Sequence, residues 1–124
     1  VKDAEKINLE EMGQKFENHP LFPERTNVQF ASISSPDKIR MRVWERGVGV
    51  TLASGSSSCA TAVAANRRGL TGKKVQIELD GGILNINWRE DGVWMTGPTM
   101  NVFAGSFSKE FFTTKSSSPK YSVQ

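Results

Sequence analysis

Hydrophobic and polar residues alternate in several short stretches of the chain, which is typical of strands with one buried face. The alternation is clear in residues 28–33, 39–43, 75–79, 84–88 and 93–96. Clusters rich in Asp, Gly, Ser and Pro separate these stretches and favour turns. Met100, Val102 and Phe107 continue the pattern and predict one or two further strands. The chain is therefore expected to build a sheet.

The first stretch with helical spacing lies near the start of the chain. Leu9, Met12 and Phe16 fall on one face of a helix, and Asn8 with Glu11 has the form of a capping box. We expect this helix to run from about residue 8 to 18 and to end before Pro20.

A second helix is predicted over residues 58–69, after a loop rich in Gly and Ser. Small side chains surround it almost completely as far as Asn66, and Gly69 is a suitable stop. We therefore expect this helix to be buried on all sides by a sheet that wraps closely around it.

Composition and charge exclude several classes of protein. The 124 residues fit one domain, and no apolar run reaches the roughly 20 residues of a membrane helix. The net charge of +3 is scattered, so we expect neither nucleic acid nor membrane as a partner. One Cys and one His form no disulfide or usual zinc site, which suits a soluble cytoplasmic protein without a metal. The chain begins with Val1 and not Met, and we expect it to be a piece of a longer protein.

Two places carry candidate chemistry. Residues 53–58 precede the second helix, where free N–H groups and the helix dipole favour an anion, although the serines there could simply cap the helix. Glu45 and Arg46 follow a strand and would suit the ammonium and carboxylate of an amino acid, or form an ordinary surface pair. Asn27 is either a ligand or a turn residue, and Cys59 is best interpreted as a small buried side chain.

Four ordered blocks resemble the C-terminal half of diaminopimelate epimerase, a cofactor-independent enzyme of lysine and cell-wall precursor synthesis. They are His-Pro-Leu-Phe-Pro-Glu-Arg-Thr-Asn-Val at 19–28, Arg-Val-Trp-Glu-Arg-Gly-Val-Gly at 42–49, Thr-Leu-Ala-Ser-Gly-Ser with Cys-Ala at 51–60, and Met-Thr-Gly-Pro at 95–98. The similarity extends over roughly residues 1–107. It implies an α+β half-barrel, with a mixed or antiparallel sheet curled around a central buried helix. We expect residues 1–110 to form this domain without its first strands, and residues 111–124 to be a disordered tail.

The resemblance also implies a role for each candidate residue. Backbone N–H groups of Gly55 and Ser56 would hold the substrate α-carboxylate, Asn27 and Arg46 would hold its distal part, and Glu45 would lie beside the reacting amino group. The family removes a proton from Cα and returns it from the opposite face with two cysteines. One of these cysteines falls on Ser54.

The sequence departs from the family pattern at three positions. Ser54 replaces the catalytic cysteine, Val50 an acidic residue and Ser57 a glycine, and the other cysteine with the whole first half is absent. We therefore expect a fragment that is inactive alone, whose partners are the missing N-terminal half and diaminopimelate, or a second copy in a homodimer. The alternative is a non-enzymatic amino-acid-binding or assembly module of the same fold.

Overall fold

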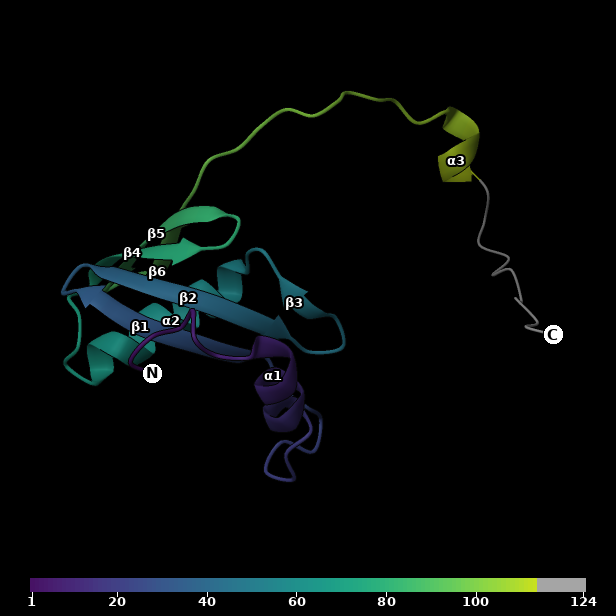
Figure 1. Cartoon of the computed structure of the whole chain (residues 1–124). Helices are drawn as coiled ribbons and strands as arrows, with labels where there is room; N and C mark the ends of the chain where they lie inside the picture. Colours follow the sequence, from purple (N-terminus) through teal and green to yellow (C-terminus); the bar gives the residue numbers. More distant parts are fainter. Residues whose placement is uncertain (114–124) are drawn as a thin grey trace.

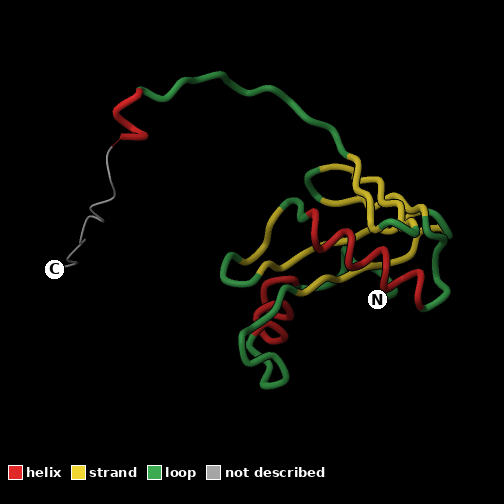
Figure 2. Tube along the Cα trace, turned by 180° about the vertical axis from the view of Figure 1, so that it is seen from behind, coloured by secondary structure: helices red, strands yellow, loops and turns green. Residues whose placement is uncertain are grey.

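Within residues 1–113, which the computed structural model describes, six strands form one mixed sheet with a long helix on one face (Figures 1 and 2). The strands are β1 (Val28–Ser35), β2 (Lys38–Glu45), β3 (Gly49–Thr51), β4 (Lys74–Leu79), β5 (Gly82–Arg89) and β6 (Gly92–Thr96). The helices are α1 (Leu9–Glu17), α2 (Gly55–Arg67) and the short α3 (Lys109–Thr113). Each strand predicted over residues 28–96 is present.

The strand order is β1-β2-β4-β5-β6, and β3 pairs with β2 beside that path. All pairs are antiparallel except β2 and β4, which α2 connects as a crossover. Residues 38–40 of β2 pair with β4, whereas residues 43–45 pair with β3. The far end of β2 therefore extends past β4 to the end of the sheet where α2 begins.

Helix α2 lies across one face of the sheet, and its contacts reach β1, β2, β4, β5 and β6. Ser58, Thr61, Ala62 and Ala65 form its buried side, whereas the opposite side is exposed, with Ala60, Ala64 and Arg67 at the surface. The hydrophobic core lies between helix and sheet and consists of Ile39, Met41, Val43, Ala62, Ala65, Val75, Ile77, Leu79 and Ile86.

The predicted half-barrel curled around a helix buried on all sides is therefore wrong. The sheet does not wrap around α2, because the strands of this chain cover only one of its sides. Small side chains let the helix approach the sheet closely, but they do not require a second layer on the opposite side. What is confirmed is the α+β class with a mixed sheet.

The two helix predictions differ in accuracy. Asn8 caps α1 by accepting a hydrogen bond from the Glu11 amide at 3.3 Å, as the capping box predicts. Helix α2 begins at Gly55, three residues before the predicted start, so that Ser56 and Ser57 lie inside its first turn. The difference arises because serine competes for backbone hydrogen bonds, so a Gly/Ser-rich run favours a loop on local grounds.

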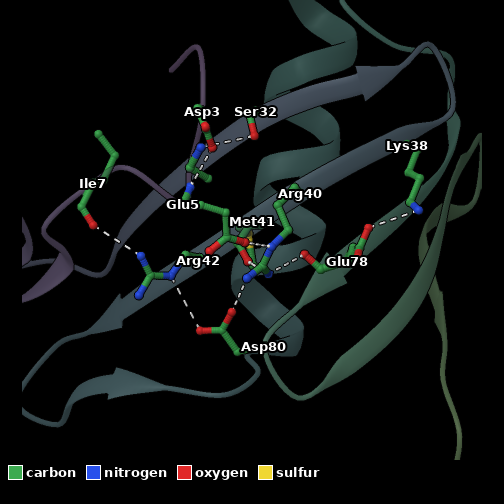
Figure 3. Close-up of polar contacts among 11 residues, drawn as sticks. Asp3, Glu5, Ile7, Ser32, Lys38, Arg40, Met41, Arg42, Glu78 and Asp80 are labelled. Carbon is green, nitrogen blue, oxygen red and sulfur yellow. Dashed lines mark hydrogen bonds and ion pairs between the residues drawn. The ribbon is translucent and has the colours of Figure 1, made fainter.

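Two arginines of β2 hold other segments against the outer face of the sheet (Figure 3). Arg40 donates to the carboxylates of Glu5, at 2.5 Å, and Asp80. Arg42 donates to the carbonyl of Ile7 at 3.2 Å and lies 3.6 Å from the Asp80 carboxylate. These contacts fix the segment that leads into α1, so the helix is placed beside the end of β2.

Residues 97–108 extend away from the sheet to α3 and form no strand (Figure 1). The further strands predicted from Met100, Val102 and Phe107 are therefore absent from the described residues, where no neighbouring strand pairs with this segment. Of the predicted tail, residues 111–113 belong to α3, and residues 114–124 lie outside the described residues. Among the described residues, no helix combines the length and apolar character needed to cross a membrane.

Candidate active site

The turn after β2 and the loop before β1 lie side by side. Val28 pairs with Trp44 in the antiparallel ladder, so Asn27 lies opposite the end of β2. The Arg46 amide donates to Asn27 Oδ1 at 2.7 Å, and Arg46 Nη1 donates to the Glu24 carbonyl at 3.1 Å. The structure thus brings Asn27 and Arg46 together, through a bond between the Arg46 backbone and the Asn27 side chain.

Glu45 ends β2 and is held from the neighbouring strand. The Thr51 hydroxyl at the end of β3 donates to Glu45 Oε1 at 2.6 Å. Glu45 and Arg46 therefore have different partners within the chain, and the Arg46 residue is exposed.

The start of α2 offers amide donors. Ser54 is the N-cap residue, with extended backbone angles, but its side chain makes no capping hydrogen bond. The first helical bond runs from the Ser58 amide to the Ser54 carbonyl at 3.0 Å, so the amides of Gly55, Ser56 and Ser57 precede it. Such amides at the positive end of a helix favour a carboxylate or phosphate.

A chain of hydrogen bonds links this helix start to β1. Ser57 Oγ accepts from Gln29 Nε2 at 2.9 Å and from the Ser54 hydroxyl at 3.1 Å. Ser54 is buried, at 8% exposure, and so is Ser57. Because Gln29 lies near the start of β1, the helix start and the Asn27–Arg46 pair meet at the same end of the sheet.

The one cysteine of the chain, Cys59, lacks the features of a reactive thiol. Cys59 lies one turn into α2, is partly buried and packs against the core. Burial raises the pKa of its thiol, which disfavours the reactive thiolate. It behaves as the small hydrophobic side chain that the sequence indicates. Residues 1–113 contain no group of three or more His, Cys, Asp or Glu side chains suited to a metal ion.

Sequence reasoning missed several residues that organise this region, namely Glu17, Gln29 and Thr51. Gln29 and Thr51 carry no local signal, because their partners are distant in the chain or lie on another strand. Glu17 does carry one, since it continues the buried stripe of Leu9 and Gly13 on α1. A carboxylate on a buried helix face indicates a specific partner.

A sequence model of the family described as diaminopimelate epimerase matches residues 1–102. The chain belongs to the diaminopimelate epimerase family. Among relatives named diaminopimelate epimerase, that of Rhodospirillum centenum is 56% identical over 110 residues, which are 88% of this chain and 38% of that protein. The protein of Bacteroides thetaiotaomicron is 54% identical over 107 residues, 85% of this chain and 40% of its own. The resemblance inferred from the sequence blocks is thereby confirmed.

This member of the diaminopimelate epimerase family spans about two fifths of the length of such relatives. Among solved structures, it is similar to the Bacillus anthracis phenazine biosynthesis protein of the PhzF family, with a TM-score of 0.54 and 28% identity. That match covers 77% of this chain and 32% of the other. Both comparisons agree that the chain corresponds to part of a larger fold.

Proposed function

We propose that this chain is the C-terminal half of a diaminopimelate epimerase, which interconverts LL- and meso-diaminopimelate without a cofactor in the cytoplasm. The amides of Gly55 and Ser56 bind the α-carboxylate of the substrate at the start of α2. Asn27 and Arg46 bind its distal end, and Glu45 lies beside the reacting amino group.

One observation supports this proposal: the start of α2, whose amides favour an anion, and the polar clamp formed by Asn27 and Arg46 lie at the same end of the sheet. The hydrogen bond from Gln29 to Ser57, at 2.9 Å, ties the helix start to β1 two residues after Asn27. An α-amino acid with a second polar end needs sites of both kinds. Fixed amides and a guanidinium suit its carboxylates, and a carboxylate suits its ammonium group.

The reaction requires one acid or base on each side of Cα. Ser54 occupies the position of one of the two family cysteines, and a hydroxyl is a weak base at neutral pH. Cys59 does not replace it, because its thiol lies one turn along α2 and its pKa is raised. We therefore propose that this chain does not epimerise its substrate alone.

The exposed side of α2 is the proposed docking surface for the missing half. A groove beside the helix on the β6 side is lined by Cys59, Ala60, Val63, Ala64, Arg67, Arg68 and Val93. A second groove on the β1 side includes Phe30, Ala31 and Ile33. A partner that covers both grooves would complete the layer that the strands of this chain do not provide.

Docking can be tested through oligomeric state. Without its partner, the chain should form dimers or larger aggregates through the same grooves and the unpaired strand edges. Sedimentation across a range of concentrations measures this. A monodisperse monomer at high concentration contradicts the proposed docking surface.

Substrate binding and catalysis can be tested separately. Titration of the ¹⁵N-labelled chain with diaminopimelate should move the amide resonances of Gly55, Ser56 and Arg46. Exchange of the substrate Cα proton in D₂O should be absent for the chain and for Ser54→Cys alone. It should appear when Ser54→Cys is combined with the first half of a relative. Exchange by isolated Ser54→Cys, or no amide response, contradicts the proposal.

A second candidate is an amino-acid-binding or assembly module without catalysis. The observation that favours it is the hydrogen-bond chain from Ser54 through Ser57 to Gln29, which uses the Ser54 hydroxyl as a structural group. This candidate predicts ligand binding with no proton exchange, even for Ser54→Cys with the first half supplied. The same exchange assay therefore separates the two functions.

A further inference from the structure

Glu17 is a buried carboxylate at the last residue of α1. Only 4% of the residue is exposed, and it accepts three hydrogen bonds from three different segments. Glu17 Oε1 accepts from Arg25 Nη1 at 3.2 Å and from the Gly47 amide at 2.9 Å. Glu17 Oε2 accepts from the Trp44 indole at 2.5 Å. One side chain thus joins the loop before β1, strand β2 and the turn after it.

The position is unfavourable for a carboxylate unless these donors are present. The end of a helix is its negative pole, and burial removes the water that would solvate the charge. The hydrogen bonds from Trp44 and Gly47 nevertheless lower the pKa of Glu17, and Arg25 and Arg46 lower it further. Those two arginines are the charged groups that act on it.

The residues that Glu17 holds lie next to the proposed clamp. Arg25 is two residues before Asn27, and Gly47 directly follows Arg46. Both held residues adopt positive φ, 61° at Arg25 and 73° at Gly47, and at Arg25 this left-handed backbone is unfavourable for a residue with a side chain. A conformation of this kind persists only where the surroundings fix it.

We propose that Glu17 is a positioning residue that sets the geometry of Asn27 and Arg46 and thereby the affinity for the distal end of the substrate. The assignment of Asn27 and Arg46 to ligand binding rests on the proposed function. The positioning itself rests on the contacts of Glu17 alone. The two parts can therefore be tested independently.

The first test uses the 124-residue chain without ligand. The Arg46 amide bonds to Asn27 and not to Glu17, so its NMR resonance reports the clamp. Acidification that protonates Glu17 should shift the Trp44 indole and Gly47 amide resonances, and the Arg46 amide should follow with the same midpoint. In Glu17→Gln the Arg46 resonance should already be displaced at neutral pH, and this titration should disappear.

The matched control is Glu10→Gln, which removes an exposed carboxylate from the same helix. It should leave the Arg46 titration unchanged. If Glu17→Gln does not fold, Trp44→Phe tests the same point, because it removes the indole donor and leaves the Arg25 and Gly47 donors to Glu17 in place. It should raise the midpoint of the Gly47 titration and displace the Arg46 amide less strongly. The proposal is overturned if the Arg46 amide resonance is unchanged in both variants, or if Glu10→Gln shifts it by the same amount.

The second test adds meso-diaminopimelate. Glu17→Gln, or Trp44→Phe if it is needed, should raise the Kd for meso-diaminopimelate about tenfold. This is the effect expected if the misplaced Arg46 loses one charge-assisted hydrogen bond to the substrate. The response of Arg46 should be lost while that of Gly55 and Ser56 remains. Unchanged affinity with an unchanged Arg46 response overturns the link to binding. If the unmodified chain shows no response anywhere, the proposed function fails, whereas the ligand-free titration still decides whether Glu17 positions the clamp.

Discussion

Replacing Gly13 by alanine should destabilise the protein, although the same change stabilises most helices. Gly13 lies in the middle of α1, where alanine is normally favoured by roughly 0.5–1 kcal/mol. Here an added Cβ would lie 2.4 Å from Trp44 Cγ and 2.6 Å from Trp44 Cβ. Normal carbon contacts are about 3.5–4.0 Å, so the helix or the indole must move by roughly 1 Å.

That movement meets resistance, because the Trp44 indole donates to Glu17 on the same helix. Overpacking of this kind typically costs about 1–3 kcal/mol, which exceeds the gain in helix propensity. We expect a net loss of about 1–2 kcal/mol, or a fall in Tm of at least about 4 °C for a domain of this size.

Urea unfolding followed by circular dichroism measures the loss. Gln14→Ala at the neighbouring exposed position is the control, and it should change stability by less than about 0.5 kcal/mol. An increase in stability for Gly13→Ala would refute the close packing of α1 on Trp44, and with it the placement of Glu17.

Three further predictions concern the same region. Arg25→Gly should be more stable than Arg25→Ala by about 1 kcal/mol. Both variants lose the ion pair with Glu17, but only glycine adopts a φ of 61° freely. Equal urea midpoints for the two variants contradict this. The charged Glu17 stabilises the fold above its ordinary pKa of 4.5, and this contribution should disappear as the pH falls through the lowered pKa of the folded state. In Glu17→Gln the urea midpoint should therefore depend less on pH, and an unchanged pH dependence contradicts this. Ser57→Ala should cost about 1–3 kcal/mol in the same assay, because the buried Ser54 hydroxyl and the half-buried Gln29 amide both lose their acceptor. A neutral effect contradicts these contacts.

Five of the six strands were predictable because their signal is local, whereas β3 was missed: its three residues lie in the stretch that the sequence predicted as a loop. Alternation of buried and exposed residues requires only the strand itself, and β4 shows it from Lys74 to Leu79. The N-cap of α1 is equally local, and Asn8 accepts from the Glu11 amide as expected. The reciprocal bond differs from a capping box, because the Glu11 carboxylate accepts from the Asn8 side-chain amide and not from its backbone N–H. Both signals depend on residues within one turn or one strand.

The surroundings of the elements were not predictable in the same way. The composition of α2 is compatible with burial on one side or on all sides, and the number of strands that cover it decides between them. Residues 97–108 have the alternation of a strand but no neighbour to pair with in the described chain. Hydrogen-bonded partners, and not the pattern alone, make such a segment a strand.

The sequence predicted candidate residues of the site but not the contacts between them. The residue pattern singled out Asn27, Glu45 and Arg46 as candidates, and the family resemblance assigned each an expected role. The direct contact between Asn27 and Arg46 emerges only from the pairing of β1 with β2. The Ser54–Ser57–Gln29 chain depends on where α2 begins, which the sequence placed three residues late.

Glu17 was overlooked, although its local environment contradicts its charge. A carboxylate at the negative end of a helix, in line with buried Leu9 and Gly13, is unfavourable on local grounds. Such a residue is tolerated when distant donors compensate for it, and here these come from positions 8, 27 and 30 residues further along the chain. Those donors flank the proposed substrate clamp, and a local conflict of this kind is expected at a functional region. An acidic residue on the buried stripe at the end of a helix therefore predicts distant hydrogen-bond donors, and in this chain it points to the residues around the clamp.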